Sequence, residues 1–528
     1  MRKFYNGGRS NVMAENGMVA TSQPLSSTEA ISILKKGGNA IDAAIAASAV
    51  QAVVEPSSTG IGGDCFAIVA FNGKQPISVN GSGMAPLKAN YDFFKKNNIK
   101  NIDLTSPHSV TVPGAVNAWY SMHKKYGKLD FKELFITAEK YARNGFPLHE
   151  VESYSWEKNK KKIIKSKTAS KYFIRNNKTF KCGEIFKNIP LANTLKAIGN
   201  NGSSAFYSNY IAKDMVKTLK SLGGLHTMED FHNQNTIYSE TIKSKYKKNY
   251  IHQCPLNSPG MVLLMMMKIL EKFNFKNIKP DSFERFHLQT EITKICFEIK
   301  EQYLGDPNFS KININKFLSN KFIDDLYKKV KLNKIYDPSK SFVTSHPETI
   351  YLSVVDRDLN CVSFINSLCH SFGSGIISKK TGVLFHNRGV NFRIKENHPN
   401  SIMGHKRPLH TIIPGLLSDK NNNAIFSYGV MGGQYQPVGQ MHVLQNIFDY
   451  GMSIQEAIDY PRAFILNGKL KLEKKVPNET FKKLKKIGHN INYTNDTIGG
   501  GQGIMIDRKN GVFIGGSDSR KDGQAIGY

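Results

Sequence analysis

The pattern of apolar and polar positions is clearest near the N-terminus, where it predicts two helices followed by two strands. Ser26 and Glu29 form a capping box that opens the first helix, and Asn39 caps the second, alanine-rich one. The predicted elements are a helix from Ser26 to Lys36, a helix from Ala40 to Val54, and strands at Cys65–Phe71 and Pro76–Asn80. The turn Asn72-Gly73 between the strands indicates a hairpin.

The remaining two thirds of the chain change from helical to strand-like periodicity. Residues from about His108 to Glu301 are predicted to be mostly helical, and 308–346 have the polar, basic composition of a mobile connection. The expected elements are helices at Ala115–Tyr126, Pro255–Lys276 and Ile323–Lys331, near Gln440–Tyr450 and at Ser453–Tyr460, and strands at Ile350–Val355 and Asn360–Asn366. Strands at both ends with helices between them favour stacked sheets between helical layers.

Composition supports an ordered protein without a membrane span. The chain has 528 residues, of which 40% are hydrophobic and 22% charged, and this is enough apolar material for a sizeable core. The longest apolar candidate, Met261–Ile269, is interrupted by Lys268 and is too short to cross a bilayer. Residues 1–16 contain no apolar export signal. We therefore expect a cytoplasmic protein with no membrane partner.

The net charge of +30 raises the question of nucleic-acid binding. Only 12 of the 72 basic residues are arginine, the side chain that recognises bases and phosphates bidentately, and the other 60 are lysine. The basic stretch at Lys158–Lys167 has the charge to hold polyanions weakly. A polyanion-binding module is nonetheless the weakest of the alternatives. Because no nucleic-acid-binding motif accompanies it, we expect no nucleic-acid partner.

The six cysteines are scattered, with no C-x-x-C pair, so the sequence predicts neither a zinc site nor a disulfide framework. The chain also lacks the P-loop, the H-E-x-x-H and the G-x-S-x-G motifs. We expect no metal and no cofactor.

Thr349 stands directly before a predicted strand and after the polar connection. Taken alone, it is most simply a threonine at a strand edge. If the chain were cut before it, its new α-amine, with a pKa of about 7.7 to 8.0, would act as general base for its own hydroxyl. Elementary chemistry does not say whether that cut occurs.

Several motifs nonetheless occur in a recognisable order. They are Gly17–Thr21, Gly37–Ala44, Thr59–Asp64, Val112–Gly114, Thr349–Asp356, Phe372–Gly375, Lys406–Pro408, Gly432-Gly433 and Ser517–Tyr528. Together they resemble the γ-glutamyltranspeptidase family over nearly the whole chain. The resemblance implies an αββα sandwich of the N-terminal-nucleophile class, self-cleavage into two subunits, and action on amide bonds.

The resemblance also assigns the catalytic positions. The nucleophile falls on Thr349, so the implied scissile bond joins Glu348 to Thr349. The hydroxyl that supports the nucleophile's amine falls on Ser367, and the oxyanion-hole glycines fall on Gly432 and Gly433. Residues 1–348 and 349–528 would then be a large and a small subunit, forming a heterodimer that makes one αββα domain.

The substrate-binding positions depart from the family pattern. Gly81–Pro86 contains no arginine for an α-carboxylate, and Val390 and Asn391 supply no acid for an α-amine. His410 and Thr411 replace a serine pair, and Cys369 replaces an asparagine. The patterns His386–Gly389 and Arg407–Thr411 resemble instead the branch that includes oxamate amidohydrolase, which hydrolyses small amides that bear a carboxylate but no α-amine.

Three residues are therefore the candidates for substrate binding. The Arg388 guanidinium matches a carboxylate, although a structural salt bridge is an equally good interpretation. His410 either binds substrate or is a satisfied core histidine, and Thr411 lies beside it. The leading hypothesis is a self-processing amidohydrolase acting on a small carboxylate-bearing amide through an acyl-threonine. The alternatives are a true γ-glutamyltransferase acting on glutathione and an unprocessed, non-catalytic binding protein.

Overall fold

The computed structural model describes residues 8–338 and 349–528, and its centre is a pair of stacked antiparallel sheets. The first sheet has the order β21 (Gln524–Gly527), β2 (Gly17–Thr21), β12 (Ile350–Asp356), β13 (Cys361–Ser367), β3 (Asp64–Ala70), β4 (Ile77–Gly81) and β9 (Ile237–Glu240). The second has the order β1 (Val12–Ala14), β20 (Val512–Ser517), β19 (Gly500–Asp507), β15 (Ala424–Met431), β14 (Gly415–Ser418), β11 (Asn249–Gln253) and β10 (Ile242–Tyr246).

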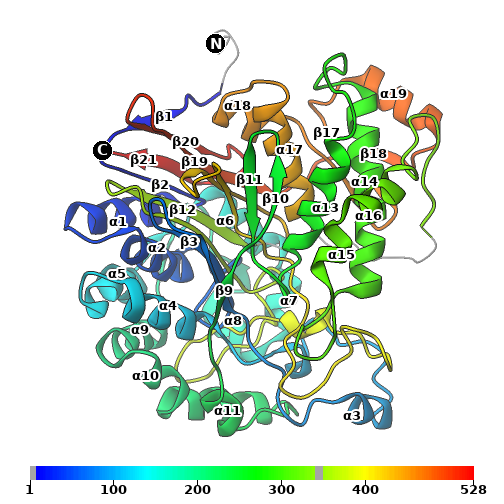
Figure 1. Ribbon diagram of the computed structural model, residues 1–528. Coiled ribbons are helices and arrows are strands. Elements are labelled where there is room, and N and C mark those ends of the chain that lie inside the picture. The colour runs from blue at the N-terminus through cyan, green and yellow to red at the C-terminus, as the bar shows by residue number, and fades with distance from the viewer. Residues whose placement is uncertain (1–7, 339–348) are drawn as a thin grey trace.

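A helical layer covers the outer face of each sheet, so the predicted αββα sandwich is confirmed (Figure 1). The layer on the first sheet includes α1 (Pro24–Lys35), α2 (Ala40–Val54), α4 (Ala115–Tyr126), α5 (Ile136–Asn144) and α9 (Ile189–Asn201). The layer on the second includes α13 (Gly260–Leu270), α14 (Phe283–Tyr303), α17 (Gln436–Phe448) and α18 (Ile454–Asp459). Every residue of α2 is buried, which explains its run of small apolar side chains.

The two sheets meet across a mainly apolar layer that includes Met18, Phe66 and Val355. Two contacts between β12 and β15 fix how the sheets are aligned. Ser353 Oγ donates a hydrogen bond to Ser427 Oγ over 2.6 Å. The ring of Tyr351 lies so close to Gly429 that a Cβ there would come within 2.3 Å of it, so only glycine fits. The first residues of β12 therefore face the last residues of β15.

Most of the N-terminal prediction is confirmed, but the start of α1 was predicted wrongly. Asn39 caps α2 with a reciprocal capping box, as expected. Helix α1 instead begins at Pro24, and the Gln23 side chain accepts the Leu25 N–H over 2.6 Å. Proline favours the first turn of a helix, so it moves the start forward. The Ser26 hydroxyl donates to the Ala47 carbonyl on α2 instead.

The middle of the chain is less helical than predicted. Strands β9, β10 and β11 lie in a stretch expected to be mostly helical, and they lengthen both sheets. Helix α13 is shorter than the predicted 255–276, and α16 (Asn320–Tyr327) ends before Lys331. The strand after Thr349 is confirmed, since β12 begins at Ile350. Glu348 and the predicted scissile bond lie outside the described residues, so the division at 348/349 stays a prediction.

None of the described helices combines the length and the apolar character that crossing a membrane requires.

Candidate active site

The register of the first sheet gathers a row of polar residues at one end of its strands. Ser367, the last residue of β13, pairs with Asp64, the first residue of β3. The pair Ile350–Asn366 places Thr349 beside Ser367, and the pair Cys65–Gly81 places Ser82 beside Asp64. Directly opposite residues of neighbouring strands project from the same face. We call Thr349, Ser367, Asp64 and Ser82 the polar row.

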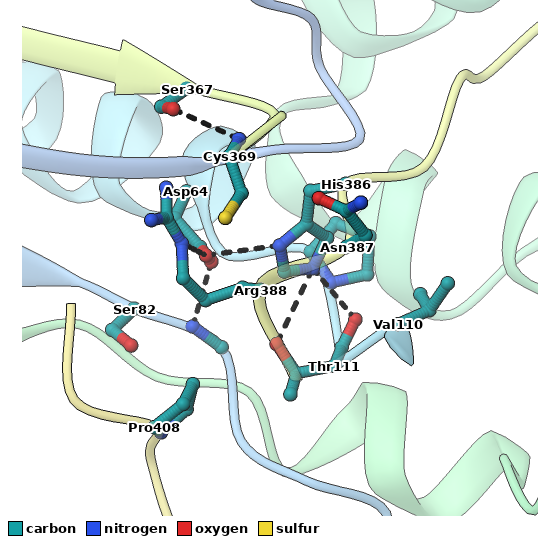
Figure 2. A network of polar contacts seen from close by, with 12 residues as sticks. Asp64, Ser82, Val110, Thr111, Ser367, Cys369, His386, Asn387, Arg388 and Pro408 are labelled. Carbon is teal, nitrogen blue, oxygen red and sulfur yellow. Dashed lines mark hydrogen bonds and ion pairs between the residues drawn. The ribbon is translucent and has the colours of Figure 1, made fainter. Parts of the chain in front are cut away.

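Thr349 and Ser367, predicted as nucleophile and supporting hydroxyl, are in contact. Their Oγ1 and Oγ atoms lie 3.0 Å apart, and both side chains are buried. The Cys369 N–H donates to Ser367 Oγ over 2.9 Å (Figure 2). A hydroxyl oxygen that accepts this backbone donor keeps its own proton and a second lone pair for Thr349. The loop after β13 thus orients Ser367 toward Thr349.

Gly432 and Gly433 follow β15 at the same end of the sandwich. Because Ser353 faces Ser427 and Tyr351 faces Gly429, continuing the alignment by two residues brings Thr349 to Met431 and Gly432. Both glycines have positive φ, +117° and +57°, which other residues adopt only with strain. The backbone therefore turns sharply at the end of β15.

Asp64 is the central charge of the site and was not assigned a role from the sequence. Its Oδ1 accepts the Gly83 N–H over 2.9 Å, and its Oδ2 lies 3.1 Å from His386 Nδ1, 3.6 Å from Arg388 Nε and 3.7 Å from His410 Nε2. Burial would raise the pKa of Asp64, but His386, His410 and Arg388 together hold it well below its usual range. Asp64 is therefore a carboxylate.

His386 bridges Asp64 to the backbone. Its Nε2 lies 2.9 Å from the Thr111 carbonyl while its Nδ1 faces Asp64, so both ring nitrogens point at acceptors (Figure 2). The available sequence signals were an aspartate closing a glycine-rich motif at the start of an apolar strand, and a histidine two residues before Arg388. Neither signal indicates that the two side chains meet.

Arg388, the predicted carboxylate anchor, is fully buried in the short η3 helix (Arg388–Asn391). Its Nη1 donates to Thr411 Oγ1 over 3.1 Å. Within the described chain, neither Nε nor Nη2 has a hydrogen-bond partner, although Nε lies within ion-pair distance of Asp64. Nε and one terminal nitrogen are the parallel donors that a guanidinium presents to a carboxylate. Thr411 thus orients Arg388, whose Nε faces Asp64 without a hydrogen bond and whose Nη2 has no hydrogen-bond partner among the described residues.

His410 contacts Ser82 of the polar row and Phe66 of β3. Its Nε2 lies 2.7 Å from Ser82 Oγ, and its ring packs edge-on against Phe66. Burial, followed by the Arg388 charge, lowers the pKa of His410 far below its ordinary value, so the ring is neutral. One of its nitrogens is satisfied, whereas Nδ1 has no partner among the described residues.

Cys369 contributes a thiol to the same site. It has a positive φ of +75°, and its Sγ lies 3.4 Å from His370 Nδ1. Burial alone would raise the pKa of the thiol, but the Arg388 guanidinium and His370 outweigh burial and lower it to about 7. Figure 2 shows the thiol on the same side of the strands as Arg388 and Asp64.

A cavity of about 290 Å³ adjoins these buried residues. Its wall includes His370, His410 and Thr411, which flank the site, and Gln434, which follows Gly433. Its charged lining residues are Lys100, Lys300, Arg393 and Glu301. Thr349 and Arg388 are buried and are not among the lining residues.

One cluster among the described residues has the spacing of a metal site. His287, Glu291 and His489 are buried, and their ligand atoms lie within 4.8 Å of one another. All three already have protein partners: His287 Nδ1 lies 2.8 Å from His489 Nε2, and Glu291 pairs with Lys294 and accepts the Tyr336 N–H. None of the three lines the cavity. The cluster is accounted for as a polar network that ties α14 to residues 331–336.

Comparison with known proteins agrees with the geometry. The profile of the gamma-glutamyltranspeptidase family matches residues 26–528. The glutathione hydrolase-like YwrD proenzyme of Bacillus subtilis (strain 168) is 34% identical over 98% of this chain and 99% of its own length. The oxamate amidohydrolase proenzyme of Klebsiella pneumoniae is 26% identical over 98% of this chain and 100% of its own. The crystal structure of cephalosporin acylase from Bacillus halodurans has a TM-score of 0.93 and 33% identity, covering 99% of this chain and 98% of that one. The resemblance seen in the sequence is confirmed: the chain belongs to the γ-glutamyltranspeptidase family of hydrolases.

Proposed function

We propose that this protein is a self-processing amidohydrolase that uses Thr349 as its nucleophile. Cleavage of the Glu348–Thr349 bond would free the Thr349 α-amine, which takes the proton of the Thr349 hydroxyl as its oxygen attacks an amide carbonyl. The N–H groups of Gly432 and Gly433 receive the oxyanion. The C–N bond then breaks, the departing amine takes the proton, and water hydrolyses the acyl-threonine ester.

The observation that carries this proposal is the buried contact between Thr349 Oγ1 and Ser367 Oγ at the start of β12. A hydroxyl that could attack and a second hydroxyl in contact with it support this proposal, and Gly432 and Gly433, which follow β15, both have positive φ. An unprocessed binding protein has no need of this arrangement. A denaturing gel that shows one uncut chain would favour that alternative.

The predicted fragments would remain associated after cleavage. Strands β12 and β13 of the small fragment lie between β2 and β3 of the large fragment, so the first sheet alternates between the two. Separating the fragments would break five ladders of backbone hydrogen bonds, three in the first sheet and two in the second, and would expose the apolar layer between the sheets. We therefore propose a heterodimer that behaves as one αββα domain.

The Nη2 of Arg388, which has no hydrogen-bond partner among the described residues, favours a substrate with a carboxylate in its acyl half. His386 is the group nearest to Asp64 Oδ2, so Arg388 is not fully neutralised by this aspartate. The runner-up, a γ-glutamyl substrate, is supported by Asp64 itself, which is the acid that the sequence did not reveal. Because His386 and Arg388 already surround Asp64, a substrate ammonium would have to displace a group of the same charge. We favour an acyl group without an α-amine.

The test is to assay purified enzyme on oxamate and on a γ-glutamyl anilide under the same conditions, with Thr349→Ala as the control for background. We expect Thr349-dependent hydrolysis and a higher kcat/KM for oxamate. A clear preference for the γ-glutamyl anilide would move Asp64 into the role of ammonium acceptor and reject our substrate class.

A further inference from the structure

Lys300 is a buried cation in the cavity wall with little to compensate it. It lies in the last turn of α14, is only 8% exposed, and lines the cavity. Its ammonium donates to Gln434 Oε1 over 2.7 Å and packs over the Phe297 ring. No other hydrogen-bond acceptor of Lys300 is found in the described chain. An ammonium has three donors, so at least one is left for a ligand.

The neighbouring acid is already engaged. Glu301 accepts from Arg393 through both carboxylate oxygens, over 2.5 and 2.7 Å to Nε and Nη2. This bidentate pair neutralises the two residues against each other. Of the charged residues in the cavity wall, Lys300 and the exposed Lys100 therefore remain as uncompensated cations. Burial lowers the pKa of Lys300 to about 8, and the Glu301 charge opposes this decrease. The side chain is therefore still a cation at pH 7.

Lys300 and Arg388 differ in their position relative to the cavity: Lys300 lines it, and Arg388 does not. Arg388 is fully buried, next to Cys369 and Thr411, and this interior position suits the acyl half of a substrate. Lys300 lies in the solvent-connected cavity and holds Gln434, the residue after Gly433. His410, Thr411 and Gln434 also line this cavity, so it adjoins the site and has room for the amine half of a substrate.

Building on the proposed function, we propose that Lys300 binds a carboxylate on the amine half of the substrate. The amide cleaved would then join a small carboxylate-bearing acyl group to an amino acid or a short peptide, rather than to ammonia. One carboxylate meets Arg388 and the other meets Lys300, with the scissile carbonyl between them beside Gly432 and Gly433.

The experiment compares two amides of oxalic acid that differ at one group. N-oxalylglycine carries a carboxylate on its amine half, and N-oxalylethanolamine carries a neutral hydroxyl at the same place. For the processed wild-type enzyme we expect kcat/KM to be about tenfold higher for the glycine amide, the factor that corresponds to about 1.4 kcal/mol. Lys300→Met should reduce this ratio to about one, and Lys300→Arg should keep most of it.

Lys100→Met is the matched control, because Lys100 lines the same cavity but is exposed and screened by solvent. It should change the ratio by less than about twofold. Two results would overturn the anchor while leaving the amidohydrolase in place: a wild-type ratio near one, or a Lys300→Met enzyme that is slower on both amides with its ratio still near ten. The second result would mean that Lys300 only supports Gln434. If neither amide is hydrolysed in a Thr349-dependent way, the proposed function fails and the anchor fails with it.

Discussion

The polar row and the cavity wall are built in different ways, although they meet at one site. Thr349, Ser367 and Asp64 stand on or next to neighbouring strands, and the sheet register alone brings them together. The wall is assembled from η3, from the loops around His370 and His410, and from the end of α14. The sheet therefore fixes the groups that we propose to react, and the loops and helix ends determine what surrounds them.

This difference predicts two kinds of variant. A change in the polar row should lower kcat for every substrate, because it alters groups that act on the scissile bond. A change in the wall should alter KM according to which charge the substrate carries. Variants that violate this division would show that the two regions act as one unit.

Thr349→Ala is the strongest test of the polar row. It removes the hydroxyl that attacks, so both cleavage of the chain and turnover should fall by at least about a thousandfold. Thr349→Ser should keep part of each. Band patterns on a denaturing gel and the hydrolysis of oxamate report the two effects. An active Thr349→Ala enzyme would require a nucleophile elsewhere.

Arg388→Ala should have the next largest effect, confined to substrates with a carboxylate on the acyl half. A charge-assisted pair with a carboxylate is worth roughly 1.5 to 3 kcal/mol, which is about ten- to a hundredfold in KM. Arg388→Lys should restore only part of this affinity, because a point charge cannot form the two parallel bonds. Equal KM values for the wild type and Arg388→Ala would assign Arg388 to a purely structural pair with Asp64.

Ser367→Ala should lower kcat by about threefold to tenfold, the range expected for one neutral hydrogen bond. Its effect should be the same for all substrates, since Ser367 contacts Thr349 rather than the cavity. Ser367→Thr, which restores the residue typical of the family, is the matched control and should retain most of the activity. A loss that depends on the substrate would place Ser367 in the wall instead.

The smallest effect on turnover is expected from changes at Glu55 and Glu152, two buried carboxyl groups outside the polar row. Burial, with Glu152 nearby, raises the pKa of Glu55 to about 8, and burial raises that of Glu152 to about 7. In the unfolded chain both carboxyl groups lose their protons near pH 4.5, whereas in the folded protein they keep them to a higher pH. The two protonated carboxyl groups therefore contribute fully to the free energy of unfolding below about pH 4.5, and this contribution is lost as the pH rises toward 8.

Glu55→Gln should reduce this loss, with each unit of raised pKa corresponding to about 1.4 kcal/mol. We expect the fall in melting temperature between pH 5 and pH 8 to be smaller in Glu55→Gln than in the wild type, with turnover at pH 7 within about twofold. A steeper fall in the variant would mean that Glu55 is ionised in the folded protein.

What the sequence could predict follows the same division. The αββα class and the strand after Thr349 were predictable because they depend on local periodicity and on motif order. Motif order also singled out Thr349 and Ser367, and the structure adds that their hydroxyls lie in contact. Asp64 was missed because its neighbours come from segments some 300 residues away. Lys300 looked like one lysine among 60, since only the fold shows that it is buried. Strands β9 to β11 were missed because polar residues interrupt their apolar pattern, including two lysines in β10.

The most direct test of the central claim is the mass of the purified protein. If Thr349 becomes an N-terminal nucleophile, mass spectrometry under denaturing conditions will find two fragments, residues 1–348 and 349–528, with Thr349 at the start of the smaller one. Their amounts should rise together with amide hydrolysis during maturation. A single uncut chain with full activity, or a small fragment that begins at any other residue, would contradict the account.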